Sequence, residues 1–233
     1  DCEVKTLTGL LTSLDDILYR NRHKKVVVTG HHPMYSHSLH GGYYPFKSHI
    51  LPFSELGINI PLPILGSIYP LYRSWIGNIQ DIPNPVYQEM RNGMVKIMAQ
   101  YPNVLYANGH EHTLQLIEKD SLYYITSGAG SKTTPVKKGA DSYFAASKKG
   151  FAQLDWLADG QTKIYFWDEN GKLLYEKNLT FKKKPFQELV VKPNQQTIPN
   201  PKFKANKFKE WLLGKNYRSI WTRPVQAPMI DLS

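Results

Sequence analysis

A β-branched run that ends in a glycine, two histidines and a proline constrains this chain more than any other feature of its sequence. Residues 26–28 are three valines, which is typical of a short buried strand. Gly30 and Pro33 then end the strand, so the imidazoles of His31 and His32 are presented at its carboxyl end. Because open α/β sheets bind their ligands at the carboxyl ends of strands, we expect a ligand site there.

A second strand-to-histidine turn occurs later in the chain. A strand predicted at residues 104–106 leads into Gly109, His110, Glu111 and His112. Alternate residues of an extended segment point the same way, so His110 and His112 can converge on one metal ion while Glu111 points away. The sequence therefore predicts a histidine-rich metal site at the ends of two strands.

The two motifs together, Gly30-His31-His32-Pro33 and Gly109-His110-Glu111-His112, resemble the calcineurin-like metallophosphoesterases, which include the purple acid phosphatases. The resemblance implies a binuclear centre of two divalent or trivalent ions, either iron, manganese or zinc. In such a centre a metal-bound water hydrolyses a phosphate ester. The resemblance also implies that His31 and His110 share one metal and that His112 binds the other.

Two further histidines are candidates for a catalytic role. His40 lies nine residues after His31. In mammalian-type purple acid phosphatases a histidine at that spacing faces the substrate phosphate, so the resemblance implies substrate contact or proton donation by His40. His32 is the second candidate. It could replace His31 as a ligand. We rank it below His31, because only one of two adjacent side chains is expected to face the ion. The alternative role of His32 is packing or a hydrogen bond that supports a ligand.

The acidic blocks of the resembled family are absent from residues 1–30. Those blocks supply a bridging aspartate, an asparagine ligand and another acid-base histidine. The fold class expected is therefore α/β (α+β), as the C-terminal half of a four-layer α/β/β/α metallophosphoesterase sandwich, with the N-terminal half of the same domain as a partner. Three imidazoles without carboxylates cannot hold two hard cations, so we expect this chain alone to be inactive unless Asp81 or Asp141 supplies the carboxylates.

Hydrophobic periodicity predicts the elements around these turns. Helices are expected over residues 7–18 and from Pro85 to residue 100. Hairpins are expected at residues 114–126 and 151–179, and the lysine- and glycine-containing residues 133–149 are expected to form an exposed loop. These elements predict two stacked sheets with helices outside.

A long insert at residues 34–83 separates the two motifs, and connections of this length are usually functional or bound to a partner. Residues 58–76 are apolar, but three prolines and Arg73 interrupt them. A spanning helix needs roughly 20 apolar residues without such breaks, so we reject a transmembrane span. Short turns folded against the domain are expected, or, as an alternative, contact with a membrane surface or a partner through Trp75.

The basic charge lies mostly outside the histidine region. The chain has 29 Lys and Arg against 19 Asp and Glu, which gives a net charge of +10. Much of the excess falls in residues 182–184 and 202–209, so a solvated basic face or tail explains it better than nucleic-acid binding, for which no motif is present. We expect the phosphoesterase region, including the insert, to occupy residues 1–184. A basic Pro- and Lys-rich tail, or a linker to a further domain, is expected at residues 185–233.

Residues 216–232 are similar to the segment that, in Bacteroidota envelope proteins, joins such a phosphoesterase domain to an outer-membrane barrel. This similarity implies a location in the cell envelope, periplasmic or outer-membrane associated, and an outer-membrane barrel as partner. Two other functions stay open. One is a catalytically silent phosphoesterase fold that acts as a docking module of an outer-membrane complex. The other is a mononuclear zinc hydrolase with three histidine ligands.

Overall fold

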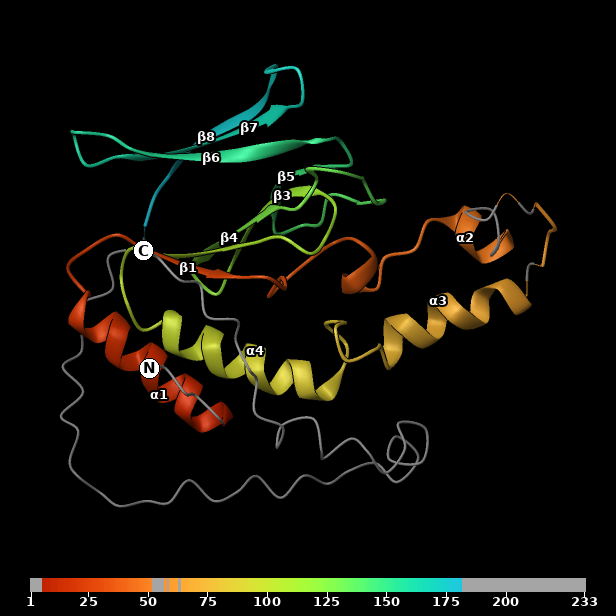
Figure 1. Cartoon of the computed structure of the whole chain (residues 1–233), viewed down its shortest axis with the longest axis horizontal. Coiled ribbons are helices and arrows are strands. Elements are labelled where there is room, and N and C mark those ends of the chain that lie inside the picture. The colour runs from red at the N-terminus through yellow and green to blue at the C-terminus, as the bar shows by residue number, and fades with distance from the viewer. Residues whose placement is uncertain (1–5, 52–56, 58, 63, 182–233) are drawn as a thin grey trace, which may run out of the picture.

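The computed structural model of the chain describes residues 6–51, 57, 59–62 and 64–181 (Figure 1). The predicted tail at residues 185–233, its boundary at residue 184 and the barrel-linker similarity lie outside the described residues. The described elements, in chain order, are α1 (Leu7–Arg20), β1 (Val26–Gly30), the 3-10 helix η1 (Leu39–Gly41), α2 (Phe46–Ile50), α3 (Leu65–Trp75), α4 (Pro85–Met98), β2 (Val104–Asn108), β3 (Leu114–Lys119), β4 (Leu122–Ser127), β5 (Ser142–Ala146), β6 (Gly150–Trp156), β7 (Thr162–Asp168) and β8 (Leu173–Leu179).

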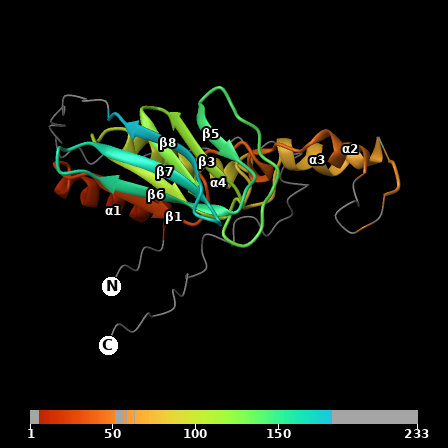
Figure 2. The ribbon, with the colours of Figure 1, turned by 90° about the horizontal axis from the view of Figure 1, so that it is seen from above.

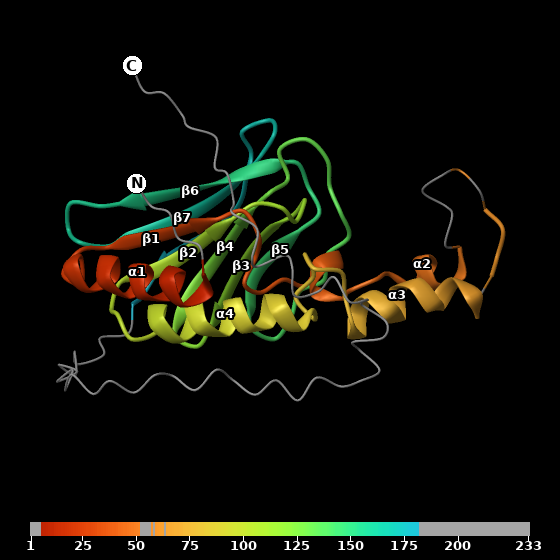
Figure 3. The ribbon, with the colours of Figure 1, turned by 60° about the horizontal axis from the view of Figure 1, so that its bottom comes forward.

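Helices α1 and α4 cover one face of the larger sheet (Figures 1 and 3). Each helix begins with a capping side chain: Thr6 before α1 and Asn84 before α4, where Pro85 takes the first helical position. Leu18 of α1 and Met98 of α4 are buried in the core that the two helices share with the sheet. The two amphipathic helices predicted from the sequence are confirmed.

The larger sheet has five strands in the order β1-β2-β4-β3-β5. β1, β2 and β4 run parallel, whereas β3 pairs antiparallel with β4 and with β5. Gly30 at the end of β1 lies opposite Asn108 at the end of β2. The two strands therefore stop at the same level, and the histidines that follow them emerge at one edge of the sheet.

The smaller sheet, β6-β7-β8, is antiparallel and stacks on the other face of the larger sheet (Figures 1 and 2). Ile164 and Phe166 of β7 are fully buried against Leu105 and Leu116 of the larger sheet. The described residues thus form a helical layer followed by two sheets. The prediction of a mixed α/β fold with two sheets is confirmed at this level.

Two expectations about connecting segments are wrong. Residues 133–149 contain a fifth strand, β5, which pairs with β3; lysines and glycines on both sides of residues 142–146 obscured it. Residues 58–76 contain α3 rather than only short turns, although Pro70 lies inside the helix. An internal proline removes a single backbone donor, and the helix continues past it to Trp75.

The described residues between 46 and 76, which we call the arm, project from the body of the domain (Figures 1 and 2). α2 packs against α3 within the arm. The backbone N–H of Leu62 donates to the Ile50 carbonyl at 2.7 Å, and the Ser67 hydroxyl lies 3.3 Å from His49 Nδ1. Among the described residues, no helix combines the length and apolar character needed to cross a membrane.

Candidate metal centre

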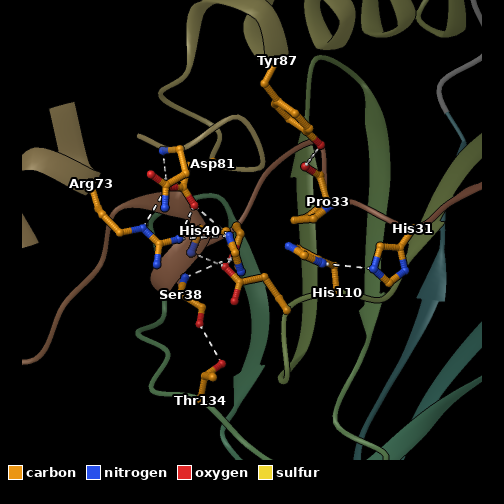
Figure 4. A network of polar contacts seen from close by, with 12 residues as sticks. His31, Pro33, Ser38, His40, Arg73, Asp81, Tyr87, His110 and Thr134 are labelled. Carbon is orange, nitrogen blue, oxygen red and sulfur yellow. Dashed lines mark hydrogen bonds and ion pairs between the residues drawn. The ribbon is translucent and has the colours of Figure 1, made fainter. Parts of the chain in front are cut away.

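Three histidines meet where β1 and β2 end. His31 Nε2 lies 3.0 Å from His110 Nδ1, although the two residues come from different motifs (Figure 4). One ring nitrogen from each of His31, His32 and His110 lies within 4.8 Å of the others. His110 reaches this position from a left-handed backbone conformation, with φ of 59°. The structure thus brings together the two histidine turns identified in the sequence.

Buried ring nitrogens without hydrogen-bond partners surround this meeting point. They are Nε2 of His32, Nε2 of His110 and Nδ1 of His112. A buried polar atom is costly unless a partner satisfies it, and a metal ion is one such partner for an imidazole nitrogen. Because three imidazoles also form a common zinc donor set, the residues present fit one metal ion.

Burial favours the neutral form of His110 and His32. Together with the neighbouring His40, His32 and His31, burial lowers the pKa of His110 to about 4. Burial, followed by His31 and His40, also lowers the pKa of His32. Neutral imidazole is the form that binds a metal, so these two histidines are ready to ligate at neutral pH.

His40 is held beside the cluster by a buried carboxylate. Its ring centroid lies 4.2 Å from that of His110, and its Nδ1 lies 2.8 Å from Asp81 Oδ1. Asp81 is fully buried and accepts hydrogen bonds from Arg73 Nε at 2.8 Å and from the Asn78 backbone N–H at 2.7 Å (Figure 4). Burial raises the pKa of Asp81, but the bonds from His40 and Arg73 outweigh it and bring the pKa to about 2.

Two groups compete for His40 Nδ1. Asp81 Oδ1, at 2.8 Å, favours the tautomer with the proton on Nδ1, whereas the Arg73 guanidinium, at 3.3 Å, can only donate to that nitrogen. Because the contact with Asp81 is the shorter one, we assign the proton to Nδ1. His40 was identified from sequence, but Arg73 was missed and Asp81 was considered only as a metal ligand. Asp81 is bound by His40 and Arg73, and Asp141 by His37 Nε2 at 2.5 Å. Neither carboxylate belongs to the three-histidine group.

Glu111 turns away from the cluster into a buried network, as predicted, but the reason given from sequence is wrong, because residues 110–112 are bends rather than an extended segment. Its Oε1 accepts hydrogen bonds from the His40 backbone N–H at 2.7 Å and from the Ser36 hydroxyl at 3.0 Å. A Cβ at Gly128 would lie 2.0 Å from the Glu111 carbonyl oxygen, so only glycine fits there without movement. Through its two hydrogen bonds, Glu111 connects the second histidine turn to Ser36 and His40, in the segment that follows the first histidine turn.

Comparison with known proteins gives structural likeness but no family. No family model matches the chain, and no curated protein matches it. Among solved structures, the chain is similar to GAP50, the anchor in the inner membrane complex of Plasmodium, at 20% identity and a TM-score of 0.43. The match covers 80% of this chain and 47% of the GAP50 chain. The chain thus spans about half the length of that protein.

His32 is closer to the cluster than its sequence ranking suggested. Its ring centroid lies 4.1 Å from that of His110, compared with 4.9 Å for His31. Both adjacent residues can reach the ion, contrary to the expectation from sequence, because the chain leaves the extended conformation after Gly30 and bends at both histidines. Both side chains therefore reach the same point.

His112 lies outside the group of three whose nitrogens are within 4.8 Å. Burial, followed by Lys132, lowers its pKa, so its imidazole is also neutral. Among the described residues, no carboxylate groups with His112 and another donor to make a second metal-type cluster. Its assignment to a second ion stays a prediction.

Proposed function

We propose that this chain carries the histidine part of the metal centre of a metal-dependent phosphoesterase. The convergence of His31, His32 and His110 at one sheet edge, with His40 beside His110, carries the proposal. These three imidazoles would hold the first ion, and His112 would help to hold a second. Bound ions of iron, manganese or zinc would neutralise phosphate oxygens and activate water as the nucleophile.

In this proposal His40 is the group of the chain that meets the substrate. Asp81 keeps the proton on Nδ1 and stabilises the imidazolium form when Nε2 also gains a proton. His40 Nε2 would then donate that proton to the leaving oxygen of the phosphate ester. Arg73 holds Asp81 in place from the arm, so Asp81 and Arg73 position His40 without touching the substrate.

The fold would be the C-terminal half of a four-layer α/β/β/α sandwich, completed by the N-terminal half of the same domain. Two features support this proposal. Residues 26–28 of β1 are only partly buried, whereas Val104, Leu105 and Tyr106 of β2 are buried, so β1 is suited to pair with a further strand. The outer face of the smaller sheet also exposes Phe151.

The missing carboxylates of a two-ion centre would come from that N-terminal half. A catalytically silent docking module is the second candidate, favoured by the absence of a carboxylate from the three-histidine group of the described residues. A mononuclear zinc hydrolase would use the three imidazoles alone. The location in the cell envelope and the outer-membrane barrel partner stay predictions that rest on residues 216–232.

Metal analysis combined with an assay of the intact protein on p-nitrophenyl phosphate tests these functions. We expect two ions per protein and hydrolysis that falls roughly a hundredfold or more in His110→Ala. His23→Ala is the matched control, because His23 is exposed after α1. One zinc ion with activity would favour the mononuclear enzyme, and an intact protein with neither metal nor activity would favour the docking module.

A further inference from the structure

Exposed apolar side chains gather on the arm. More than half of the large hydrophobic side chains that are exposed in the described residues lie between residues 46 and 76. Single exposed hydrophobics are ordinary, but a concentration of this kind on one projection marks an interaction surface. The arm that carries this surface extends outward from the body of the domain (Figure 1).

One face of α3 carries the centre of this surface. Ile64, Ile68, Leu71 and Trp75 are between 44% and 84% exposed. Their spacing of four, three and four residues places them on one side of a helix. We call these four residues the α3 stripe.

The rest of α3 is fixed to the domain by polar contacts. The guanidinium of Arg73 binds the buried Asp81, and the Ser74 hydroxyl donates to the Gly42 carbonyl at 2.8 Å. Turning the stripe inward would break the ion pair and leave a buried charge without a partner, which is strongly unfavourable. The outward direction of the α3 stripe is therefore built into the fold.

We propose that the α3 stripe docks on the surface of a lipid bilayer that contains anionic phospholipid. The apolar surface extends beyond the stripe to Leu65, about a quarter turn away, and to Phe46 on α2, which is 78% exposed. A protein groove covers one helix face and meets it with a polar rim. Lipid can instead surround apolar side chains on several sides of the arm, which fits this distribution better.

The charge of the whole chain, rather than that of the arm, suits the same ligand. Lys47 of the arm is exposed, Asp81 neutralises Arg73, and the sequence of residues 46–76 also contains Glu55. The whole chain carries a net charge of +10, much of it in residues 182–184 and 202–209, and an anionic lipid surface attracts this charge. Because α3 has 11 residues, it is too short to span the bilayer, so the arm lies in the interface with Trp75 at the level of the headgroups.

Flotation of the intact protein with vesicles tests the proposal. The vesicles are made of phosphatidylcholine with phosphatidylglycerol, or of phosphatidylcholine alone. The test variant combines Ile68→Ser with Trp75→Ser. The matched control combines Trp156→Ser with Leu157→Ser, which removes side chains 50% and 40% exposed at the end of β6, away from the arm.

We expect the wild type and the control to float with the mixed vesicles and to bind phosphatidylcholine alone more weakly. The partition coefficient of the stripe variant should fall at least roughly tenfold, because two apolar side chains no longer enter the lipid. An Ile68→Leu variant, which keeps the apolar character, should bind like the wild type.

Three results would overturn the proposal. One is failure of the wild type to bind vesicles. Another is unchanged binding of the stripe variant that disappears at high salt, which would assign binding to basic residues elsewhere in the chain. The third is a wild type that does not bind lipid but self-associates in sedimentation velocity without lipid, together with a stripe variant that has lost this self-association. The α3 stripe would then bind a second copy of the chain.

Discussion

Asp81 Oδ1 lies 2.8 Å from His40 Nδ1, so a buried carboxylate from the end of the insert holds the histidine nearest to the metal-type cluster. Arg73 binds the same carboxylate from α3. The insert at residues 34–83 therefore contributes to the site as well as to the exposed arm.

Asp81→Asn keeps the shape of the side chain but removes its negative charge. We expect kcat for a phosphate monoester to fall roughly tenfold to a hundredfold with unchanged metal content, because His40 loses the partner that sets its tautomer. The Nδ1–H signal of His40 in nitrogen-15 NMR spectra should also change. The control is Asp141→Asn, which acts on His37 instead. An Asp81→Asn enzyme with wild-type kcat would show that His40 needs no such partner.

Arg73→Met should destabilise the fold more than a surface substitution does. The change leaves the fully buried Asp81 without its main cation, and breaking a buried ion pair typically costs about 3–5 kcal/mol. Urea unfolding measures the loss, with Lys47→Met on the exposed side of the arm as the control. Equal stability of the two variants would mean that Asp81 is solvated or protonated in the folded protein.

The stability of the metal-free protein should decrease as the pH falls from about 6.5 towards about 4. The pKa of His110 is lowered from 6.5 to about 4 in the folded chain, so in this range the unfolded chain takes up the proton and the folded chain does not. Urea unfolding as a function of pH should show a smaller slope in His110→Gln than in the wild type. Identical slopes would indicate that His110 titrates normally in the folded protein.

Gly128→Ala should lower the free energy of unfolding by roughly 1–3 kcal/mol. The added Cβ would lie 2.0 Å from the backbone oxygen of Glu111, which cannot move without shifting the second histidine turn. Gly130→Ala is a close control, because no atom lies within 4 Å of a Cβ placed there. Thermal unfolding of the two variants gives the comparison, and a Gly128→Ala protein as stable as Gly130→Ala would contradict the packing described for Glu111.

The meeting of the two histidine turns was predictable from sequence, because each follows a short apolar strand and parallel strands carry their ligands at one end. The partners of His40 were not predictable. Asp81 lies outside any helix or strand, 41 residues from His40, and its position depends on how the arm folds. α3 itself was missed because Pro70 breaks the helical pattern in sequence while removing only one donor in the structure.

The parallel pairing of β1 with β2 has a consequence for the order of folding. The two strands are separated by the whole insert and by α4, so this contact closes one of the longest loops in the described chain and is expected to form late. The histidine cluster exists only once that contact has formed. A bound ion would therefore stabilise the pairing of β1 with β2. Amide hydrogen exchange at Val28 and Tyr106 should slow when metal is added.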